Sequence, residues 1–225
     1  MAVEVFISIE GPEGAGKTTL AVELGRRLTD AGSRVWLTFE PGGTALGREV
    51  RRIVRFGVGG RNDEPGPPLE PRAETLLFLA ARAQLVNEVL LPRLKAGEVV
   101  ICDRYADSTL AYQCYGRGLS REAVEPALEF ATGGLRPRLT FLLDVDPQVG
   151  LARNRGKEPL GPVDRFEAQN QEFHDRVRAG YLELARGEPE RWRVLDAGRP
   201  AADIADSAWA EVQRVLETSA ERFTG

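Results

Sequence analysis

The sequence has few cysteines, no strong excess of charge of either sign, and no apolar run near the roughly 20 residues that a membrane helix needs. Its two cysteines, Cys102 and Cys114, match neither a disulfide framework nor a zinc site. Residues 1–10 lack the basic segment that begins a signal peptide. The net charge of −4 provides no general attraction to nucleic acid or to anionic membranes. These absences favour a protein of the reducing cytoplasm, with neither nucleic acid nor membrane as a partner, in which any anion site is local.

The composition is that of a globular protein with a regular succession of elements. Hydrophobic residues make up 42% and charged residues 28% of the 225 residues, enough for one domain with a full core. Strands are predicted at residues 3–9, 34–39, 98–102, 139–145 and 191–195. Helices are predicted at residues 17–32, 46–56, 72–95, 106–115, 121–132, 165–186 and 201–218, with a shorter one beginning at 147. This alternation predicts an α/β fold, a parallel sheet with helices on both faces, and a single domain over residues 1–225.

Residues 11–18 form a phosphate-binding motif between a predicted strand and a predicted helix. They read Gly-Pro-Glu-Gly-Ala-Gly-Lys-Thr and match G-x-x-x-x-G-K-[ST] in the context that this motif requires. Glycines allow the backbone N–H groups of such a loop to turn towards a phosphate, and the following helix adds its N-terminal dipole. The residues predicted to bind ATP here are Gly11, Gly14, Ala15, Gly16, Lys17, Thr18 and Thr19. The alternative is an ordinary glycine-rich turn, which the flanking strand and helix disfavour.

Three side chains of this region are assigned to phosphate and metal. Lys17 is predicted to reach the β- and γ-phosphates, and Thr18 to offer its hydroxyl to Mg²⁺. Asp103 ends another apolar strand, where an aspartate of a phosphate-loop protein holds Mg²⁺. The alternative for Asp103 is the N-cap of the next helix, a role compatible with the metal.

The chain resembles bacterial thymidylate kinases over nearly its whole length. The resemblance rests on an ordered set of segments: Ile9-Glu10-Gly11 with the phosphate loop, Glu40-Pro41-Gly42-Gly43-Thr44, Leu77-Phe78-Leu79-Ala80-Ala81-Arg82, Asp103-Arg104-Tyr105, Ser108-Thr109 with Ala111-Tyr112-Gln113, Gly116-Arg117-Gly118, Asp164-Arg165-Phe166-Glu167 and Tyr181-Leu182. It implies a three-layer P-loop kinase fold with a five-stranded parallel sheet, a short basic lid and a homodimer. It also implies Mg²⁺-dependent transfer of the ATP γ-phosphate to dTMP, which yields dTDP.

Two residues of the predicted helix 72–95 are candidates for reading the acceptor base. Phe78 and Arg82 are four positions apart and share a helix face. An aromatic ring can stack on a base, and a guanidinium can donate to the O4 carbonyl of thymine, where cytosine presents an amino group. The alternative is that Phe78 belongs to the core and Arg82 is a solvated surface charge.

The rest of the acceptor site follows partly from charge and partly from the resemblance. Arg104 comes directly after Asp103 and is predicted to pair with the phosphate of the acceptor. Arg51 is a second candidate for that phosphate, with a surface position as its alternative. The resemblance implies that Glu13 contacts the 3′-hydroxyl of the sugar and that Tyr112 lies under the sugar. It also assigns the remaining substrate contacts, and raises the expectation of a cis bond before Pro41; these residues are Glu40, Pro41, Ser108, Thr109 and Gln113.

A basic stretch over about residues 153–165 is predicted to be the lid. Its charges stand among glycines and prolines that interrupt a helix. Such a flap can close over the phosphates and exclude water, although an ordinary solvated loop is the alternative. The resemblance places the catalytic arginine either in the phosphate loop or in the lid. Because this phosphate loop contains none, Arg153 or Arg155 is expected to act in catalysis together with Lys17 and Glu13.

Two further features lie near the C-terminus. Residues 196–200 resemble the loop that surrounds adenine in related kinases, which assigns Arg199 to ATP binding, although a plain strand-to-helix turn would look the same. His174, the single histidine, lies in a polar helix and is predicted to be a surface residue.

Two other functions are compatible with part of this pattern. A P-loop kinase for another nucleoside monophosphate or for a deoxynucleoside shares the phosphate loop, Asp103 and the lid, but does not need Phe78, Arg82 and Tyr112 together. A non-catalytic nucleotide-binding switch calls for an effector surface or a partner domain, which the sequence does not suggest.

Overall fold

The computed structural model describes residues 5–60, 66–155 and 165–221, and these form the predicted α/β architecture. The sheet has five parallel strands in the order β2-β3-β1-β4-β5. They are β1 (Phe6–Glu10), β2 (Val35–Phe39), β3 (Val99–Asp103), β4 (Leu139–Asp144) and β5 (Trp192–Asp196). Both faces of β1, β3 and β4 are covered, and their residues are almost all buried, as the apolar composition of these segments predicted.

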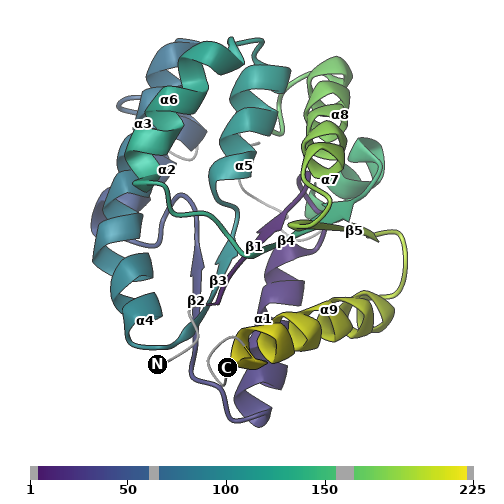
Figure 1. Cartoon of the computed structure of the whole chain (residues 1–225). Coiled ribbons are helices and arrows are strands. Elements are labelled where there is room, and N and C mark those ends of the chain that lie inside the picture. Colours follow the sequence, from purple (N-terminus) through teal and green to yellow (C-terminus); the bar gives the residue numbers. More distant parts are fainter. Residues whose placement is uncertain (1–4, 61–65, 156–164, 222–225) are drawn as a thin grey trace.

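One face of the sheet is covered by two helices, α1 (Lys17–Asp30) and α9 (Ala201–Glu221) (Figure 1). The predicted stripe of Leu20, Leu24 and Leu28 on α1 is buried in this layer. The leucines recur every four residues, so that they face the sheet while the other side of the helix meets solvent.

The remaining helices lie on the opposite face or, in the case of the helix that contains Gly150, against the phosphate loop (Figure 1). They are α2 (Ala45–Phe56), α3 (Pro71–Leu85), the π-helical turn η1 (Val86–Leu90), α4 (Leu91–Lys95), α5 (Ala106–Thr109), the π-helical turn η2 (Leu110–Gly116), α6 (Arg121–Thr132), α7 (Pro147–Arg155) and α8 (Gln171–Gly187). The predicted helix 72–95 is therefore one helical run with a wider turn in its middle.

The structure corrects two expectations about these helices. Helix α8 begins at Gln171 instead of residue 165, because Asn170 caps it by accepting the Phe173 N–H at 3.0 Å. Judged by length and composition alone, Pro71–Lys95 is long and apolar enough for a membrane-spanning helix, although no such run was expected from the sequence. Its buried Glu74 and Arg82 bond to other elements, which is how a core helix of a globular protein behaves.

The strand order positions the loops that matter for function. In the register of the sheet, Ile9 of β1 is paired with Asp103 at the end of β3, and Phe39 at the end of β2 is also paired with Asp103. The segments that follow β1, β2 and β3 therefore start side by side at one edge. The Glu40–Pro41 bond just after β2 is cis, as predicted. Cys102 and Cys114 are both buried and unbridged.

Candidate active site

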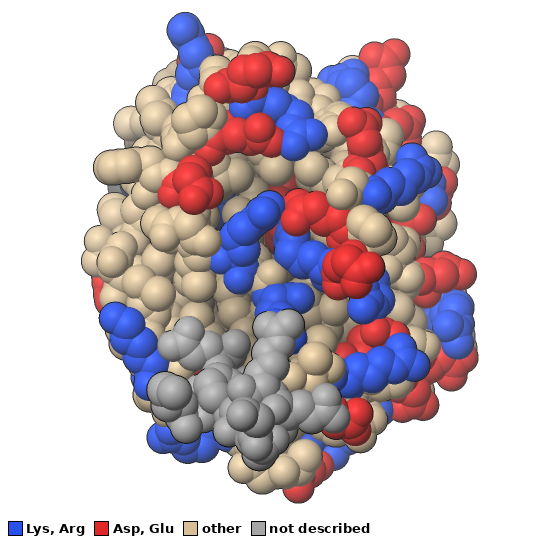
Figure 2. All heavy atoms as spheres, in the orientation of Figure 1, with Lys and Arg blue, Asp and Glu red and all other residues tan. Residues whose placement is uncertain are grey.

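A cleft of about 580 Å³ opens at the edge where β1, β2 and β3 end, the side on which open α/β sheets bind ligands. Most of the predicted binding residues line it: Glu13, Gly14, Gly16, Lys17, Thr18, Thr19, Glu40, Pro41, Arg51, Phe78, Arg82, Asp103, Arg104, Ser108, Thr109, Tyr112 and Gln113. Of the described candidates, Gly11, Ala15, Arg153 and Arg199 are not part of the lining. Basic and acidic side chains are interspersed on the face shown in Figure 2.

The phosphate loop is held close to its neighbours by glycines. Gly14 has φ +67°, and a Cβ at this position would lie 1.8 Å from the Gly150 carbonyl oxygen of α7. Lys17 is buried, and its Nζ donates to the carbonyls of Gly11 at 3.2 Å and Pro12 at 2.7 Å. Burial, aided by the nearby Arg104 cation, lowers the pKa of Lys17 to about 8. The buried ammonium group of Lys17 is well suited to bind a phosphate, because the negative phosphate would stabilise the positive charge of Lys17.

Thr18 and Asp103 form the second part of the loop region. The Thr18 hydroxyl donates to Asp103 Oδ2 at 2.6 Å. The helix-cap alternative for Asp103 is not what is observed, because the N-cap of α5 is Tyr105 and has no side-chain cap bond. A hydroxyl and a carboxylate oxygen in contact fit the oxygen ligands that Mg²⁺ takes together with substrate phosphates and water. The donor set present here is therefore compatible with that ion.

Glu13 of the phosphate loop has polar partners at one of its two carboxylate oxygens, while Oε2 has no hydrogen-bond partner among the described residues. Its Oε1 accepts the Tyr112 hydroxyl at 2.6 Å and lies 3.5 Å from Arg104 Nη2. Burial by itself would raise the pKa of Glu13, but the cations of Arg104 and Lys17 and the Tyr112 hydrogen bond hold it below its ordinary value. Glu13 is therefore an anion that can accept a further hydroxyl.

Arg104 lines the cleft next to the phosphate loop. Its φ of +67° is rare for a residue with a side chain, and its backbone N–H donates to the Ile9 carbonyl at 2.9 Å. Nη1 donates to the carbonyl of Gly11 at 2.9 Å and to the Tyr181 hydroxyl at 3.1 Å, and Nη2 donates to Tyr112 at 3.1 Å. The backbone and the guanidinium are thus both fixed beside the phosphate loop.

Arg82 is buried, and the expectation of a solvated surface charge as its alternative role is excluded. Nε and Nη2 donate to Glu40 Oε2 at 2.8 and 2.5 Å. Nη1 donates to the Thr109 hydroxyl at 2.7 Å, and Nη2 also donates to the Tyr105 carbonyl at 3.0 Å. These contacts tie α3 to the segments after β2 and β3, so that Arg82 is at once a structural ion pair and part of the cleft wall.

Part of the cleft lining is aromatic. Phe78 is partly buried, and its ring centre lies 6.0 Å from that of Phe166. Phe166 in turn stands 5.8 Å from the ring of Tyr112. A planar ligand between these rings would meet aromatic surface next to the Arg82 guanidinium.

A model of the thymidylate kinase family matches residues 9–208 of the chain. The chain belongs to the thymidylate kinase family. It is 50% identical over 212 residues to a thymidylate kinase of Deinococcus radiodurans, covering 94% of this chain and 98% of that protein. It is 46% identical over 212 residues to one of Thermomicrobium roseum, covering 94% and 96%. The crystal structure of the thymidylate kinase from Ehrlichia chaffeensis is 30% identical and matches with a TM-score of 0.72 over 95% of this chain and 98% of that chain. The predicted P-loop kinase fold and family are thereby confirmed.

In this member of the thymidylate kinase family, the described part of the lid region faces the loop after β5. Arg153 Nη1 donates to the Ala197 carbonyl at 2.8 Å. The side chain of Arg155 and residues 156–164, including Lys157, lie outside the described residues. Arg199 is exposed, with its Nη2 3.6 Å from Asp203. The structure therefore joins α7 to the predicted adenine loop, and which lid arginine acts in catalysis stays a prediction.

Arg51 of the kinase lies at the rim of the cleft. Its Nη1 is 3.4 Å from the Pro41 carbonyl, and its guanidinium carbon is 5.6 Å from the centre of the Phe39 ring. Its place in the cleft lining distinguishes it from the neighbouring Arg48, which is exposed. Gln113 is buried and donates to Glu74 at 3.1 Å.

The prediction that His174 is a surface residue was wrong. It is buried, and its Nδ1 lies 3.8 Å from Glu13 Oε2. His174 stands three and seven positions before Val177 and Tyr181, which are also buried, so the same helical spacing could have placed it on the inner face. The polar residues between these positions made the whole helix look solvent-exposed in the sequence.

Other residues that the sequence-based set lacked also belong to the site. Glu10 at the end of β1 and Tyr181 on α8 bond to each other and to Ser108 beneath the cleft. Asn154, Phe166 and Glu167 line the cleft. The motif segments contained Glu10, Phe166, Glu167 and Tyr181, but spacing along the chain does not show that they converge.

Proposed function

We propose that this chain transfers the γ-phosphate of ATP to dTMP, giving dTDP for dTTP synthesis, in a reaction that depends on Mg²⁺. The observation that carries this proposal is the single cleft that joins a phosphate loop, Arg104 and an aromatic wall with Arg82. A phosphoryl-transfer enzyme needs two phosphate sites in line, and it needs positioning and charge stabilisation more than covalent chemistry.

The donor end is assigned to the phosphate loop and its helix. Backbone N–H groups of the loop, the α1 N-terminus and Lys17 bind the ATP phosphates. Thr18 and Asp103, whose side chains touch, would hold the metal. When bound, Mg²⁺ would neutralise phosphate charge as it builds up in the transition state. Arg199 and the loop at 196–200 are assigned to the adenosine part.

The acceptor end is assigned to the deeper part of the cleft. Arg104 pairs with the 5′-phosphate of dTMP, with Arg51 as a second cation at the rim. Glu13 accepts the 3′-hydroxyl, and Tyr112, bonded to Glu13, lies under the sugar. The other contacts to the acceptor are assigned to Glu40, Pro41, Ser108, Thr109 and Gln113.

Base recognition is assigned to Phe78 and Arg82. Phe78 stacks on thymine. A guanidinium has five N–H donors, and the contacts of Arg82 engage Nε, both hydrogens of Nη2 and one hydrogen of Nη1. The other Nη1 hydrogen is the donor for the O4 carbonyl. Cytosine presents an amino group at that position, so that two donors would face each other.

Closure of the site is assigned to the lid at about residues 153–165, with Arg153 or Arg155 stabilising the transferring phosphoryl group. Arg153 already joins α7 to the loop after β5, so a nucleotide bound at that loop would also affect the position of α7. We also propose that residues 1–225 act as one domain in a cytoplasmic homodimer.

The test is an ADP-release assay in which dTMP, dUMP, dCMP, dGMP and thymidine are offered in turn with ATP and Mg²⁺. We expect the highest kcat/KM with dTMP. A higher kcat/KM with another monophosphate or with thymidine would assign a different acceptor. Slow ATP turnover that no acceptor stimulates would indicate a nucleotide-binding switch.

A further inference from the structure

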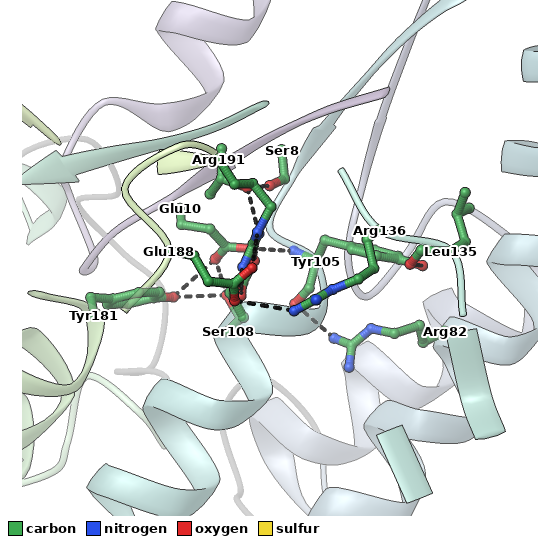
Figure 3. A network of polar contacts seen from close by, with 12 residues as sticks. Ser8, Glu10, Arg82, Tyr105, Ser108, Leu135, Arg136, Tyr181, Glu188 and Arg191 are labelled. Carbon is green, nitrogen blue, oxygen red and sulfur yellow. Dashed lines mark hydrogen bonds and ion pairs between the residues drawn. The ribbon is translucent and has the colours of Figure 1, made fainter. Parts of the chain in front are cut away.

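Glu10 is a buried carboxylate that points towards Ser108, a residue of the cleft lining, and towards Tyr181 (Figure 3). It closes β1, directly before the phosphate loop. Oε1 accepts the backbone N–H of Tyr105 at 2.7 Å. Oε2 accepts the Ser108 hydroxyl at 2.6 Å and the Tyr181 hydroxyl at 3.1 Å. One carboxylate therefore joins the end of β1 to the segment after β3 and to α8.

Each of these contacts joins Glu10 to a group next to Arg104. The Tyr105 N–H belongs to the residue after Arg104, so Oε1 fixes the backbone that holds Arg104 at its φ of +67°. The two hydroxyls on Oε2 lie next to the guanidinium: Arg104 Nη1 donates to Tyr181 at 3.1 Å and is 3.4 Å from Ser108. Among the contacts of the described residues, Glu10 interacts with Arg104 through charge and through these intervening groups, with no direct hydrogen bond between the two side chains.

We propose that Glu10 is a positioning residue for the acceptor phosphate, which directs the Arg104 guanidinium into the cleft through the hydroxyls of Ser108 and Tyr181. This rests on the proposed function, in which Arg104 binds the phosphate of dTMP. The ionised carboxylate can only accept, so the hydrogens of the two hydroxyls, which lie 2.8 Å apart, point towards Oε2 or towards each other, and their oxygen lone pairs are left turned towards Arg104. A neutral carboxyl instead donates a hydrogen to one of those hydroxyls, whose own hydrogen must then turn away from Glu10, where it competes with the Nη1 hydrogens of Arg104 for the space between these groups.

The protonation of Glu10 would therefore change the acceptor site. Burial and the nearby Asp107 raise the pKa of Glu10 to about 7, against the lowering effect of Ser108 and Arg104. The titratable and charged groups that face Glu10 from the surrounding elements are Lys17, Arg82, Cys102, Arg104, Asp107 and Tyr181. As the pH falls through about 7, Glu10 takes up a proton and the KM for dTMP should rise.

The decisive variant is Glu10→Gln, which keeps the shape and removes the charge and the titration. The KM for dTMP should rise about tenfold, the effect of losing one charge-assisted hydrogen bond, while the KM for ATP changes less than about twofold. In the wild type the KM for dTMP should rise from pH 8 to pH 6 beyond the change due to dTMP's own phosphate, whose pKa is about 6. Glu10→Gln should show only the part of this pH-dependent rise in KM that is due to the phosphate of dTMP.

Glu74→Gln is the matched control. Glu74 is another buried carboxylate near the cleft, but it bonds to Arg117 and Gln113 instead of the Arg104 group. Its pH profile should follow that of the wild type, whatever its effect on KM. Because Glu10→Gln can fail to fold, Tyr181→Phe is the second variant. It keeps the Glu10 charge, loses one bridging hydroxyl, and should raise the KM for dTMP several-fold with kcat nearly unchanged.

Arg104→Ala separates failure of this inference from failure of the proposed function. If Arg104→Ala leaves the KM for dTMP unchanged, the assignment of Arg104 to the acceptor phosphate is wrong. If that variant impairs dTMP binding while Glu10→Gln retains both the KM and the pH profile of the wild type, only the positioning role is overturned. If the role is correct, adding Glu10→Gln to Arg104→Ala has little further effect on the KM for dTMP.

Discussion

Replacing Arg82 with Met should destabilise the protein as well as impair dTMP recognition. The variant removes both hydrogen bonds to Glu40 Oε2 and those to Thr109 and Tyr105. Glu40 is 6% exposed, and its other oxygen has no hydrogen-bond partner within the described chain. Without Arg82 this carboxylate must either lie unpaired in the interior or take up a proton.

The expected magnitude follows from the burial of both partners. Removing one member of a buried ion pair costs about 3–5 kcal/mol. For a chain of this size, each kcal/mol lowers the melting temperature by about 2–4 °C, so the melting temperature should fall by about 6–20 °C. Thermal and urea unfolding of Arg82→Met measure this directly. Arg51→Met, which removes a partly exposed arginine from the same cleft, is the matched control and should lose less than about 1 kcal/mol.

Two further measurements separate the structural from the recognition role. Adding Glu40→Gln to Arg82→Met should restore part of the lost stability, since no buried charge is then left unpaired. At a temperature where Arg82→Met is fully folded, kcat/KM for dTMP should still be about 10- to 150-fold below wild type, the value of a charge-assisted hydrogen bond. The preference for dTMP over dCMP should narrow. A melting temperature within about 2 °C of wild type, with the preference unchanged, would refute both roles.

Three further outcomes are expected. Lys17→Ala should abolish turnover in a protein that still folds, because it removes a transition-state contact worth several kcal/mol. The affinity of the wild type for ATP should weaken above pH 8, where Lys17 loses its proton, and isothermal titration calorimetry at several pH values measures that affinity. The free energy of unfolding of the wild type should fall as the pH rises from 4.5 to about 7, because Glu10 stays protonated in the folded protein over this range while it ionises in the unfolded chain. At about 1.4 kcal/mol per pKa unit the loss is on the order of 3 kcal/mol. Urea unfolding of Glu10→Gln should not show this pH-dependent loss. EDTA should stop turnover. Asp103→Asn should raise the Mg²⁺ concentration at which the rate is half-maximal. A rate that does not depend on Mg²⁺ would contradict the assignment of Thr18 and Asp103 as the metal site.

Features encoded by neighbouring residues could be predicted from the sequence alone. The phosphate loop is contiguous, and the strand before it and the helix after it lie where the pattern places them. Helix α6 occurs at the residues where it was predicted, and the structure shows Ser120 as its N-cap and a glycine after its last residue. The start of α8 was missed, because the side chain of Asn170 decides it, in a stretch that also reads as helical.

Charges in the interior were harder to interpret. The spacing of Phe78 and Arg82 correctly put both on the cleft side of α3. It said nothing of Glu40, 42 residues away, or of Thr109, 27 residues away, which bury the guanidinium. His174 was misplaced for the same reason: its burial depends on the contact of α8 with the phosphate loop.

The sequence by itself determined the class of fold, the phosphate loop and the family, because these depend on local periodicity and on motifs whose residues are adjacent. Only the tertiary structure decided the strand order β2-β3-β1-β4-β5 and the convergence of Glu10, Ser108 and Tyr181 around Arg104. Glu10 and Tyr181 are separated by 171 residues, and their contact exists only once β1 and α8 are packed together. That packing removes Glu10 from water, so its pKa is a property of the fold and cannot be read from the residue type.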